Sequence, residues 1–600
     1  MIVVFGGTTE GRMAVNTLDS AGSAFFYSTR DAAQEVDMHN GSRLCGAMDA
    51  GQIASFCREE GIRLIVDAAH PFAAGLHKEI ATAAAATGLP VVRYERRYPE
   101  PDAGCVMCRD YDDAIKRILG SGARKILVLT GVQTIGKLRG LWSERRCIVR
   151  ILDRDSSRDI VHNEGFPQED VRYYHPAETD SLTAIEHPDA ILTKESGESG
   201  EFRQKMAAAK EAGIPLYVVA RPQLPDGFIT VDGPEGLRKE VEKRVPGFYP
   251  LRSGFTTGAC ATAATKAAAL LLTEKKCSSR ISITLPSGEH INLPVATARL
   301  QESTACAEVI KDGGDDPDAT HGCRVCVRIS RRADNEIKIR GGEGIGKVTL
   351  PGLGLPVGEW AINPVPRKMM AQAVREAGLK GADIEVSIPG GERIALQTFN
   401  SRVGVIGGVS VIGTSGIVRP FSNEAFMTAI EREIDVACAV GSSIIVLNSG
   451  ARSEKMVKSF YPGLHPSAFI HYGNAIGEAL KACVRKEVAE VAVGLMLGKA
   501  VKLAEGHLDT HSHKVSMNTK FLASLAAIAG CSTEAQTRLR SIKLARTIPD
   551  ELSATDNALF FPKLAERCHA TLSTLTDTTR LTVILLSDSG ELLARNPRFA

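Results

Sequence analysis

"MIVVFGGTTEGR", residues 1–12, joins a short apolar run to glycines and then to residues that can start a helix. Similar apolar runs recur up to about residue 243, separated by alanine-rich amphipathic segments. This alternation is typical of parallel strands connected by helices. It predicts two Rossmann-like lobes, over residues 1–118 and 119–244. The further runs are "SAFFYST", "RLIVDAA", "LPVVRYE", "KILVLTG", "DAILTKE" and "PLYVVAR".

A domain boundary is expected at residues 245–252, because "VPGFYPLRSG" (245–254) places two prolines and two glycines after a charged helix pattern. Beyond it, the helix pattern "GACATAATKAAALLLT" precedes short strands joined by turns, which predicts an α+β domain over 253–400. Strand and helix patterns then alternate again, which predicts a further Rossmann-like domain over 401–600. The predicted fold class is α/β and α+β multidomain.

The composition narrows the function classes. The 600 residues carry a formal net charge of +2 with dispersed basic residues, which argues against a nucleic-acid partner and leaves small-molecule substrates. No stretch approaches the roughly 18–20 apolar residues of a membrane span, and the N-terminus lacks the basic start of a signal peptide. The 14 cysteines therefore predict reduced thiols and a cytoplasmic location. The pairs Cys105/Cys108 and Cys323/Cys326 are too far apart for a zinc ribbon.

The glycines after the first strand pattern form a candidate cofactor loop. Gly6, Gly7 and Gly11 open a helix, where backbone amides can face an anionic group. Their spacing is G-G-x-x-x-G and not the dinucleotide fingerprint G-x-G-x-x-G. Arg30 follows the second strand pattern, where an arginine would meet the 2′-phosphate of NADPH. The alternative is a flavodoxin-like loop with tightly packed glycines and a surface arginine.

"VDAAHPFA" places Asp67 at the end of the third strand pattern and His70 three residues later. Ligands of parallel sheets bind at the carboxyl ends of strands, and a carboxylate with an imidazole can deliver a proton. A helix cap followed by a turn explains the same residues equally well.

"GGTTEGR", "DAAHPFA", "LTGVQTIGKL" and "TKESGESGEFRQKMAAAKEAGIPLYVVARP" together resemble the precorrin-6A reductase family of cobalamin biosynthesis over nearly all of residues 1–243. The resemblance implies NADPH-dependent reduction of one double bond of the corrin precursor. It also implies three groups of site residues. They are Gly6, Gly7, Thr8 and Gly11 for the cofactor, Asp67 and His70 near the macrocycle, and Lys194, Ser196 and Gly197 in a second ligand loop.

Two motifs beyond residue 252 look like common ligand-binding motifs, but each departs from the pattern that its ligand requires. "DGGDDPDATHG" (312–322) is rich in aspartate, but its spacing puts proline or histidine where a calcium hand needs its turn glycine. "GGEGIGKVT" matches the phosphate-binding Walker A pattern except at Val348, which replaces the magnesium-binding hydroxyl. A glycine-rich turn that lines a ligand cleft explains the second motif better.

Small polar residues begin the helix pattern in "LRSGFTTGACATAATKAA". Ser253, Thr256 and Thr257 offer hydroxyls and amides suited to carboxylates. Cys260 lies in the first helical turn, where it is either a thiolate or, more simply, a small buried residue. Two later loops, "GTSGIVRPFSNEA" and "LNSGAR", follow strand patterns and could hold a nucleoside and its carboxylate; the first contains Gly413, Thr414, Ser415 and Gly416.

From Leu251 nearly to the C-terminus, the chain resembles the cobalt-precorrin-5B C1-methyltransferase family. Five motifs carry the resemblance: "LRSGFTTGACATAATKAA", "DGGDDPDATHG", "GGEGIGKVTLPGLGLPVGEWAINPVPR", "GTSGIVRPFSNEA" and "GHLDTHSHKVSMNTKFLA". The resemblance implies S-adenosylmethionine as methyl donor and a cobalt-corrinoid substrate. A carboxylate that steadies the sulfonium or removes a proton is expected from the acidic loop. The candidates are Asp315, Asp316, Asp318 and His321.

His507, His511 and His513 of "HLDTHSH" suggest a metal cluster, but the substrate already carries cobalt. Hydrogen bonding of His511 to macrocycle carboxylates is therefore preferred, and no protein-held metal is expected. The two family resemblances imply consecutive steps of one pathway on one chain, where fusion raises the local concentration of the intermediate. The alternative is a corrinoid- or metal-binding module fused to an NADPH-dependent oxidoreductase.

Overall fold

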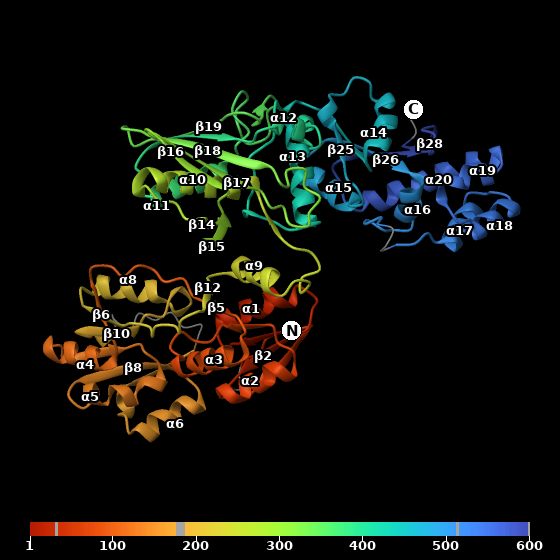
Figure 1. Ribbon diagram of the computed structural model, residues 1–600. Helices are drawn as coiled ribbons and strands as arrows, with labels where there is room; N and C mark the ends of the chain where they lie inside the picture. The colour runs from red at the N-terminus through yellow and green to blue at the C-terminus, as the bar shows by residue number, and fades with distance from the viewer. Residues whose placement is uncertain (31–33, 176–185, 512–514, 598–600) are drawn as a thin grey trace. The chain divides into compact units, whose positions relative to one another are not determined.

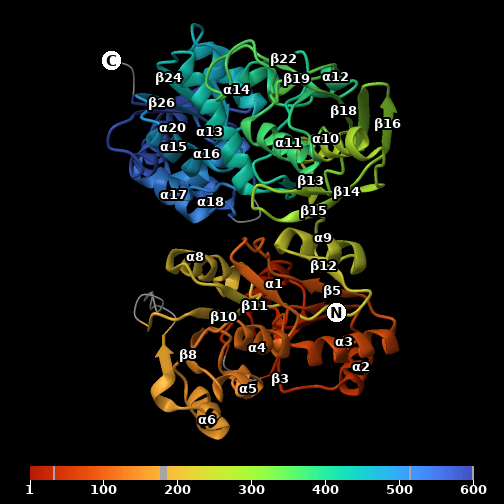
Figure 2. The same ribbon diagram turned by 90° about the vertical axis from the view of Figure 1, so that its left-hand side faces the viewer.

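The computed structural model describes residues 1–30, 34–175, 186–511 and 515–597. Its contacts divide the chain into two compact units: residues 1–251 with 289–291, and residues 252–288 with 292–600. Within the first unit, two lobes are visible, one around α1 to α3 and one around α4 to α6 (Figure 1; Figure 2). The expected mixture of α/β and α+β folds is confirmed.

The first lobe is built on a parallel sheet with helices on both faces. Alternate residues of β1 point to opposite faces: Ile2 and Val4 pack with α1 and α9, whereas Val3 and Phe5 pack with α2 and α3. In spatial order the strands are β12 (Ile229–Val231), β5 (Val91–Tyr94), β4 (Leu64–Asp67), β1 (Ile2–Phe5), β2 (Phe25–Thr29) and β3 (Gly41–Cys45). The helices are α1 (Thr9–Asp19), α2 (Ala50–Glu59), α3 (Ala74–Thr87) and α9 (Pro234–Arg244).

The second lobe repeats this plan. Its parallel strands, in spatial order, are β6 (Cys105–Cys108), β11 (Leu216–Val219), β10 (Ala190–Lys194), β7 (Lys125–Val128), β8 (Arg146–Leu152) and β9 (Val171–Tyr174). Its helices are α4 (Tyr111–Gly120), α5 (Arg139–Trp142), α6 (Asp155–Glu164) and α8 (Phe202–Ala212). The lobes do not divide at residue 118, because β6 pairs with β11, and the chain returns to the first sheet through β12. Short edge strands such as "CVMC" carry too weak a pattern to reveal this from sequence.

The α+β part of the second unit packs α10 (Thr257–Glu274) and α11 (Pro364–Glu376) beside a mixed five-stranded sheet. That sheet runs β16 (Thr297–Gln301), β17 (Thr304–Ile310), β18 (Arg324–Arg331), β21 (Ala382–Ser387) and β19 (Ile337–Gly341). Three two-stranded sheets complete it: β13 (Gly254–Phe255) with β23 (Ile417–Val418), β14 (Arg280–Thr284) with β15 (His290–Pro294), and β20 (Lys347–Val348) with β22 (Val405–Ile406). The short helix α12 (Gly391–Ala395) follows β21.

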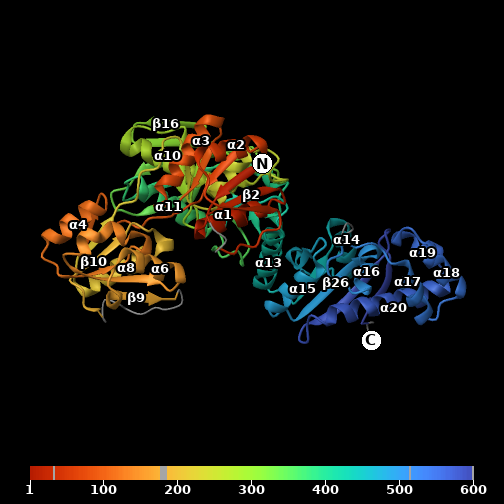
Figure 3. The ribbon, with the colours of Figure 1, turned by 90° about the horizontal axis from the view of Figure 1, so that it is seen from below.

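A second sheet forms the C-terminal part, with α13 standing between it and the α+β part (Figure 1; Figure 3). Its order is β25 (Phe469–His471), β24 (Ile444–Asn448), β26 (Glu490–Met496), β27 (Arg580–Leu586) and β28 (Leu592–Asn596), all parallel except β28. The helices are α13 (Asn423–Ala439), α14 (Ala451–Val457), α15 (Ile476–Arg485), α16 (Leu497–Ala504), α17 (Thr519–Ile528), α18 (Thr533–Ser541), α19 (Ile548–Glu551) and α20 (Ala554–Ser573).

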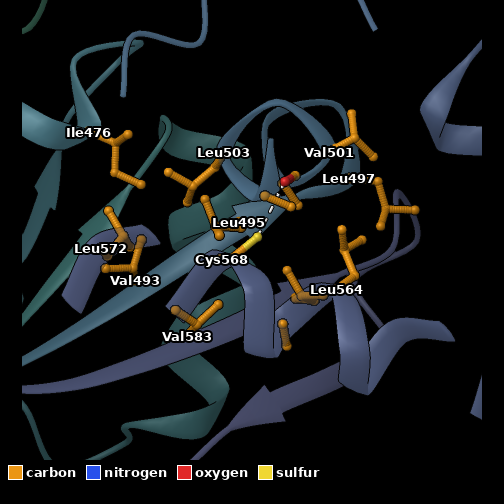
Figure 4. Packing of buried hydrophobic residues seen from close by; sticks show 14 of the residues in the cluster. Ile476, Val493, Leu495, Leu497, Val501, Leu503, Leu564, Cys568, Leu572 and Val583 are labelled. Atoms are coloured by element: carbon orange, nitrogen blue, oxygen red, sulfur yellow. Dashed lines mark hydrogen bonds between the residues drawn. The ribbon is translucent and has the colours of Figure 1, made fainter. Parts of the chain in front are cut away.

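The expected boundary at residue 401 is too early, because the α+β part extends at least to residue 418. Residues 405–406 and 417–418 pair with strands of the α+β part, so "VGVIGGVSVIGTSG" supplies no strand to the C-terminal sheet. The C-terminal core is mostly aliphatic: Leu495 of β26 and Leu564 and Cys568 of α20 lie together, and the Cys568 thiol donates to the carbonyl of Ala500 (Figure 4). In the part of the chain that the structure describes, no helix is long and apolar enough to cross a membrane.

Candidate active sites

The glycine loop between β1 and α1 packs against Tyr27. A Cβ on Gly6 would lie 2.3 Å from Cε2 of Tyr27, and one on Gly11 would lie 2.9 Å from its hydroxyl, so both positions exclude a side chain. The Gly7 amide donates to the Tyr27 hydroxyl at 2.9 Å, and the Gly11 amide donates to Oγ1 of Thr8 at 3.0 Å. Packing against Tyr27 therefore explains why glycine occupies positions 6 and 11, and two backbone amides of the loop already donate to acceptors within the protein.

Space for a ligand remains at Gly7. This residue is exposed, has φ of 96°, and has no atom within 4 Å of the position that a Cβ would take. Burial raises the pKa of Tyr27 above its usual value, although Arg43 and Arg12 oppose this with their charges. Arg30 is exposed after β2. The loop thus combines an open glycine and a helix N-terminus with two basic side chains, Arg12 and Arg43, close enough to act on Tyr27.

Asp67 belongs to a buried ion-pair network and lies at the carboxyl end of β4. Its Oδ2 is 2.6 Å from Nδ1 of His77, and its Oδ1 is 3.0 Å from Nη1 of Arg93. Burial alone would raise the pKa of Asp67, but the hydrogen bond with His77 and the charge of Arg93 outweigh it and lower the pKa. The side chain is 0% exposed, so the structure favours a positioning role for Asp67 over contact with a substrate.

His70 lies after the same strand but is half-buried and pairs differently. Its Nδ1 accepts from the amide of Phe72 at 3.1 Å. Burial, with the charges of Lys194 and Arg96, lowers the pKa of His70 to about 3. The imidazole is therefore neutral near pH 7 and can donate a hydrogen bond through Nε2, but it carries no proton to deliver as an imidazolium.

Lys194 ends β10 and faces this site. Its Nζ lies 5.2 Å from the ring centroid of Phe72. Burial, with the charges of Lys205 and Arg96, lowers the pKa of Lys194 to about 8. A lysine with such a pKa is a competent proton donor near neutral pH. Lys194 therefore holds the transferable proton that His70 lacks.

Arg96 organises the loop after β10. It donates to the carbonyl of Ser196 at 2.9 Å and pairs with Glu10 at 3.0 Å. A Cβ on Gly197, which has φ of 70°, would lie 2.9 Å from the Arg96 side chain, so glycine is needed there. Sequence reasoning missed Arg96 and Glu10, although Glu10 lies inside the quoted "GGTTEGR" and Arg96 directly follows "LPVVRYE". Only the folded unit brings them to residues 196–197.

The acidic loop 312–322 connects β17 and β18 and engages most of its acids within the protein. Asp315 accepts from the amide of Arg252 at 2.7 Å, and Asp316 accepts from the amide of Phe421 at 3.0 Å. His321 accepts from the amide of Gly313 at 3.0 Å. The three predicted residues Asp315, Asp316 and His321 therefore shape the loop and its contacts.

Asp318 is different because it faces a cavity of about 320 Å³. Its Oδ2 lies 2.6 Å from Nζ of Lys311, whose side chain is 1% exposed, and its Oδ1 accepts from the hydroxyl of Thr320 at 2.6 Å. Burial would raise the pKa of Asp318, but Lys311 outweighs it and the pKa is lowered. The cavity joins this ion pair to mostly aliphatic walls from residues 353–361, 403–412 and 418.

The start of α10 supplies another wall of the same cavity through Thr256 and Thr257. Thr256 caps the helix by accepting from the amide of Ala259 at 3.1 Å, and Thr257 accepts from the amide of Ile412 at 2.9 Å. Ser253 is fully buried nearby in sequence. Cys260 is buried, and burial raises its pKa to about 12, which favours the small buried residue over the thiolate.

The other predicted segments lie elsewhere. The Walker-like segment connects β19 to β20 with no helix after it, and Lys347 lies 4.7 Å from the ring centroid of Trp360. The amide of His511 donates to Asp509 at 3.1 Å, and His507 lies 3.7 Å from Glu505. His513 lies outside the described residues. Among the residues that are described, no group of three His, Cys, Asp or Glu side chains could hold a metal ion.

Three family models match this chain. "Precorrin-6x reductase CbiJ/CobK" matches residues 1–239, "CbiD" matches residues 246–420, and "CbiD, C-terminal domain" matches residues 509–597. A solved structure named CobK precorrin-6A reductase is 22% identical, with a TM-score of 0.33, and covers 41% of this chain and 97% of that chain.

Curated relatives match about half of this chain. The cobalt-precorrin-5B C(1)-methyltransferase of Geobacillus kaustophilus is 42% identical over 53% of this chain and 87% of the relative. The enzyme of the same name from Prosthecochloris aestuarii is 43% identical over 53% of this chain and 89% of the relative. The chain belongs to the cobalt-precorrin-5B C(1)-methyltransferase family and carries, ahead of that part, a precorrin-6x reductase domain of the same cobalamin pathway.

Proposed function

We propose that this chain catalyses two consecutive steps on a cobalt-corrinoid: C1 methylation of cobalt-precorrin-5B with S-adenosylmethionine, then NADPH-dependent reduction of the cobalt-precorrin-6A formed. The observation that carries the proposal is the pairing of two family matches, each over a unit with its own candidate site. When bound, S-adenosylmethionine supplies an electrophilic methyl group and NADPH supplies a hydride.

The residues of the first unit fit NADPH. The open space at Gly7 and the N-terminus of α1 suit the pyrophosphate, and the exposed Arg30 would meet a 2′-phosphate. Lys194 and Arg96 are basic groups suited to the carboxylates of a corrinoid. Lys194 would also protonate the carbon next to the one that receives hydride, while the buried Asp67 holds Arg93 and His77 in place.

The cavity beside the acidic loop fits methyl transfer, because that reaction needs aligned partners and excluded water more than a protein nucleophile. Aliphatic walls exclude water, and the Lys311–Asp318 pair places one fixed charge pair at the wall. Asp318 is the acidic-loop residue best placed to steady positive charge. Thr256 and Thr257 offer hydroxyls to the substrate from the same cavity.

The test measures the mass of the corrinoid after each of the two steps. Full-length protein given cobalt-precorrin-5B and S-adenosylmethionine should add one methyl group, and the addition of NADPH should then add two hydrogens. The variant Lys194→Met should still methylate, which separates the two activities. If the protein binds the corrinoid tightly but changes its mass in neither step, the corrinoid-binding module is the correct function. Equal turnover with NADH would refute the choice of NADPH.

A further inference from the structure

A second cavity, of about 600 Å³, lies in the C-terminal part of the second unit. Its lining residues follow three neighbouring parallel strands: Ser449 and Gly450 follow β24, Gly498 and Lys499 follow β26, and Asp588 follows β27. The carboxyl ends of parallel strands meet at one edge of a sheet, so this cavity opens at the carboxyl edge. The segment Leu544–Arg546, between α18 and α19, forms its remaining wall.

The strand order makes this edge a topological switch point. From β24 the chain crosses to β25 on one side, and from β25 it crosses back to β26 on the other side of β24. From β26 the chain continues to β27 on that other side, so the segments that leave the adjacent strands β24 and β26 go in opposite directions. Open parallel sheets bind ligands in the crevice that such a reversal creates. The cavity lies between the ends of β24 and β26, where the reversal occurs.

We propose that this cavity binds the methyl donor, a nucleoside that carries an amino-acid tail, as an inference that rests on the methyl transfer proposed above. The chemistry of its lining matches each part of S-adenosylmethionine. Met496 and the half-exposed Leu544 offer an apolar surface to adenine. Asp588 offers a carboxylate to ribose hydroxyls or to the ammonium group, and the cation Arg546 offers a partner to the carboxylate.

Among the described residues, Arg546 has no partner that would compete with a ligand. Its side chain is exposed and forms no hydrogen bond or ion pair with any residue that the structure describes. The neighbouring cations are engaged: Arg452 donates to the carbonyl of Asp588 at 2.5 Å, and Lys499 donates to the side chain of Asn474. Arg546 is therefore the cation that remains available for a ligand carboxylate.

The Gly413–Gly416 loop, which the sequence suggested for the same donor, has another explanation. A Cβ on Gly413 would lie 2.2 Å from Oγ1 of Thr256, and a Cβ on Gly416 would lie 2.6 Å from Cδ2 of Leu285. These glycines are needed for packing against the α+β part. The loop also precedes β23, which pairs antiparallel with β13 and belongs to no parallel sheet.

Contacts along the carboxyl edge connect the proposed donor cavity to the acidic loop. Lys499, at the cavity, bonds to Asn474, which follows β25. The next residue back, Gly473, leaves room for the ring of Phe426 at the start of α13. Just before that helix, Phe421 donates its amide to Asp316. The donor site and the acidic loop thus lie at two ends of one contact path within the second unit.

The test fills the cavity without straining the backbone. Gly450 has an extended backbone, with φ of 164°, and neither Gly450 nor Gly498 has an atom within 4 Å of the position that a Cβ would take. Gly450→Phe and Gly498→Leu should each weaken binding of S-adenosylhomocysteine at least about tenfold. Titration calorimetry on the full chain, with and without the corrinoid, measures the Kd. Gly463→Phe, at an exposed glycine outside the cavity with equally open space, should leave the Kd unchanged.

Two further comparisons make the outcome decisive. Thr414→Trp should leave the Kd unchanged; if it abolishes binding while Gly450→Phe and Gly498→Leu bind normally, the donor site is at the Gly413–Gly416 loop and the inference is overturned. Arg546→Ala should weaken S-adenosylhomocysteine several-fold but leave 5′-methylthioadenosine, which lacks the carboxylate, unaffected. Circular dichroism and chemical denaturation confirm folding of each variant. If wild-type protein neither binds the donor nor transfers a methyl group, the proposed function itself fails.

Discussion

Asp316 accepts a hydrogen bond from the backbone amide of Phe421 at 3.0 Å, and so ties the acidic loop to the start of α13. Phe421 has φ of 52°, a left-handed conformation that a bulky residue rarely adopts, and its side chain is 69% exposed. Strained residues persist where the surrounding structure holds them, often beside ligands. The arrangement presents an aromatic ring to solvent near the loop proposed for methyl transfer.

The substitution Phe421→Asn relieves the backbone strain and removes the exposed ring, and its effects on stability and on methyl transfer can be measured separately. Asparagine tolerates the left-handed region, so the variant should be about 1 kcal/mol more stable in urea unfolding. Loss of the exposed ring should slow methyl transfer and raise the KM for the corrinoid, because a planar contact with the macrocycle is lost. Phe426→Ala, in the first turn of α13, is the control for loss of an aromatic side chain without relief of strain. A stability gain with unchanged kinetics would leave Phe421 without a role in the reaction.

Asp318→Asn should damage both stability and methyl transfer. It leaves the ammonium of Lys311 buried without its partner, and breaking a buried pair in this way costs about 3 kcal/mol. Asp315→Asn is the matched control, since Asp315 lies on the same loop but is exposed, and it should change the free energy of unfolding less. Chemical denaturation and a methyl-transfer assay on both variants make the comparison. Equal effects from the two substitutions would rule out a special role for the Lys311–Asp318 pair.

Asp67→Asn should act on the stability of the first unit before it acts on chemistry. The carboxylate is buried between His77 and Arg93, and its loss should cost about 3 kcal/mol. Because the folded-state pKa of Asp67 is lowered, its stabilisation is present above the unfolded-state pKa of about 3.9 and is lost as pH falls below it. The variant should therefore lose less stability on acidification than wild type. His70→Asn, at a half-exposed site, should unfold like wild type. If His70→Asn were less stable than Asp67→Asn, the stabilising role of the Asp67 ion-pair network would be contradicted.

The titration of Lys194 should set the upper pH limit of the reductase activity. The lowered pKa of about 8 means that the amine is protonated below that pH and neutral above it, so reduction should slow as pH rises through about 8. Lys194→Arg keeps the positive charge but does not release its proton, so both it and Lys194→Met should be slow at every pH, and only Lys194→Met should also raise the KM for the corrinoid. NADPH oxidation followed from pH 6 to 10 gives the profiles. A Lys194→Met profile that still falls near pH 8 would assign the limit to another group.

Several local features were predictable from the sequence because they depend on neighbouring residues. The apolar runs that start at residues 2, 25, 64 and 91 are strands of one parallel sheet, and "GACATAATKAAALLLT" is a helix. Hydrophobic periodicity fixes such elements before any tertiary contact forms. The motifs also identified both families, since five or so ordered motifs carry more information than any one spacing.

The pairing of distant segments was not predictable from the sequence. No local pattern shows that β12 returns to the first sheet, that Asp67 faces Arg93 instead of solvent, or that Asp318 alone among the acidic candidates faces the apolar cavity. The glycines at 6, 11, 413 and 416 look like ligand loops in sequence, yet side chains packed against them account for them. Periodicity depends on consecutive residues, so the sequence alone determined most of the strands and helices and the family. Burial and ion pairing depend on residues tens or hundreds of positions apart, so the tertiary structure alone decided which polar residues face a cavity and which hold the protein together.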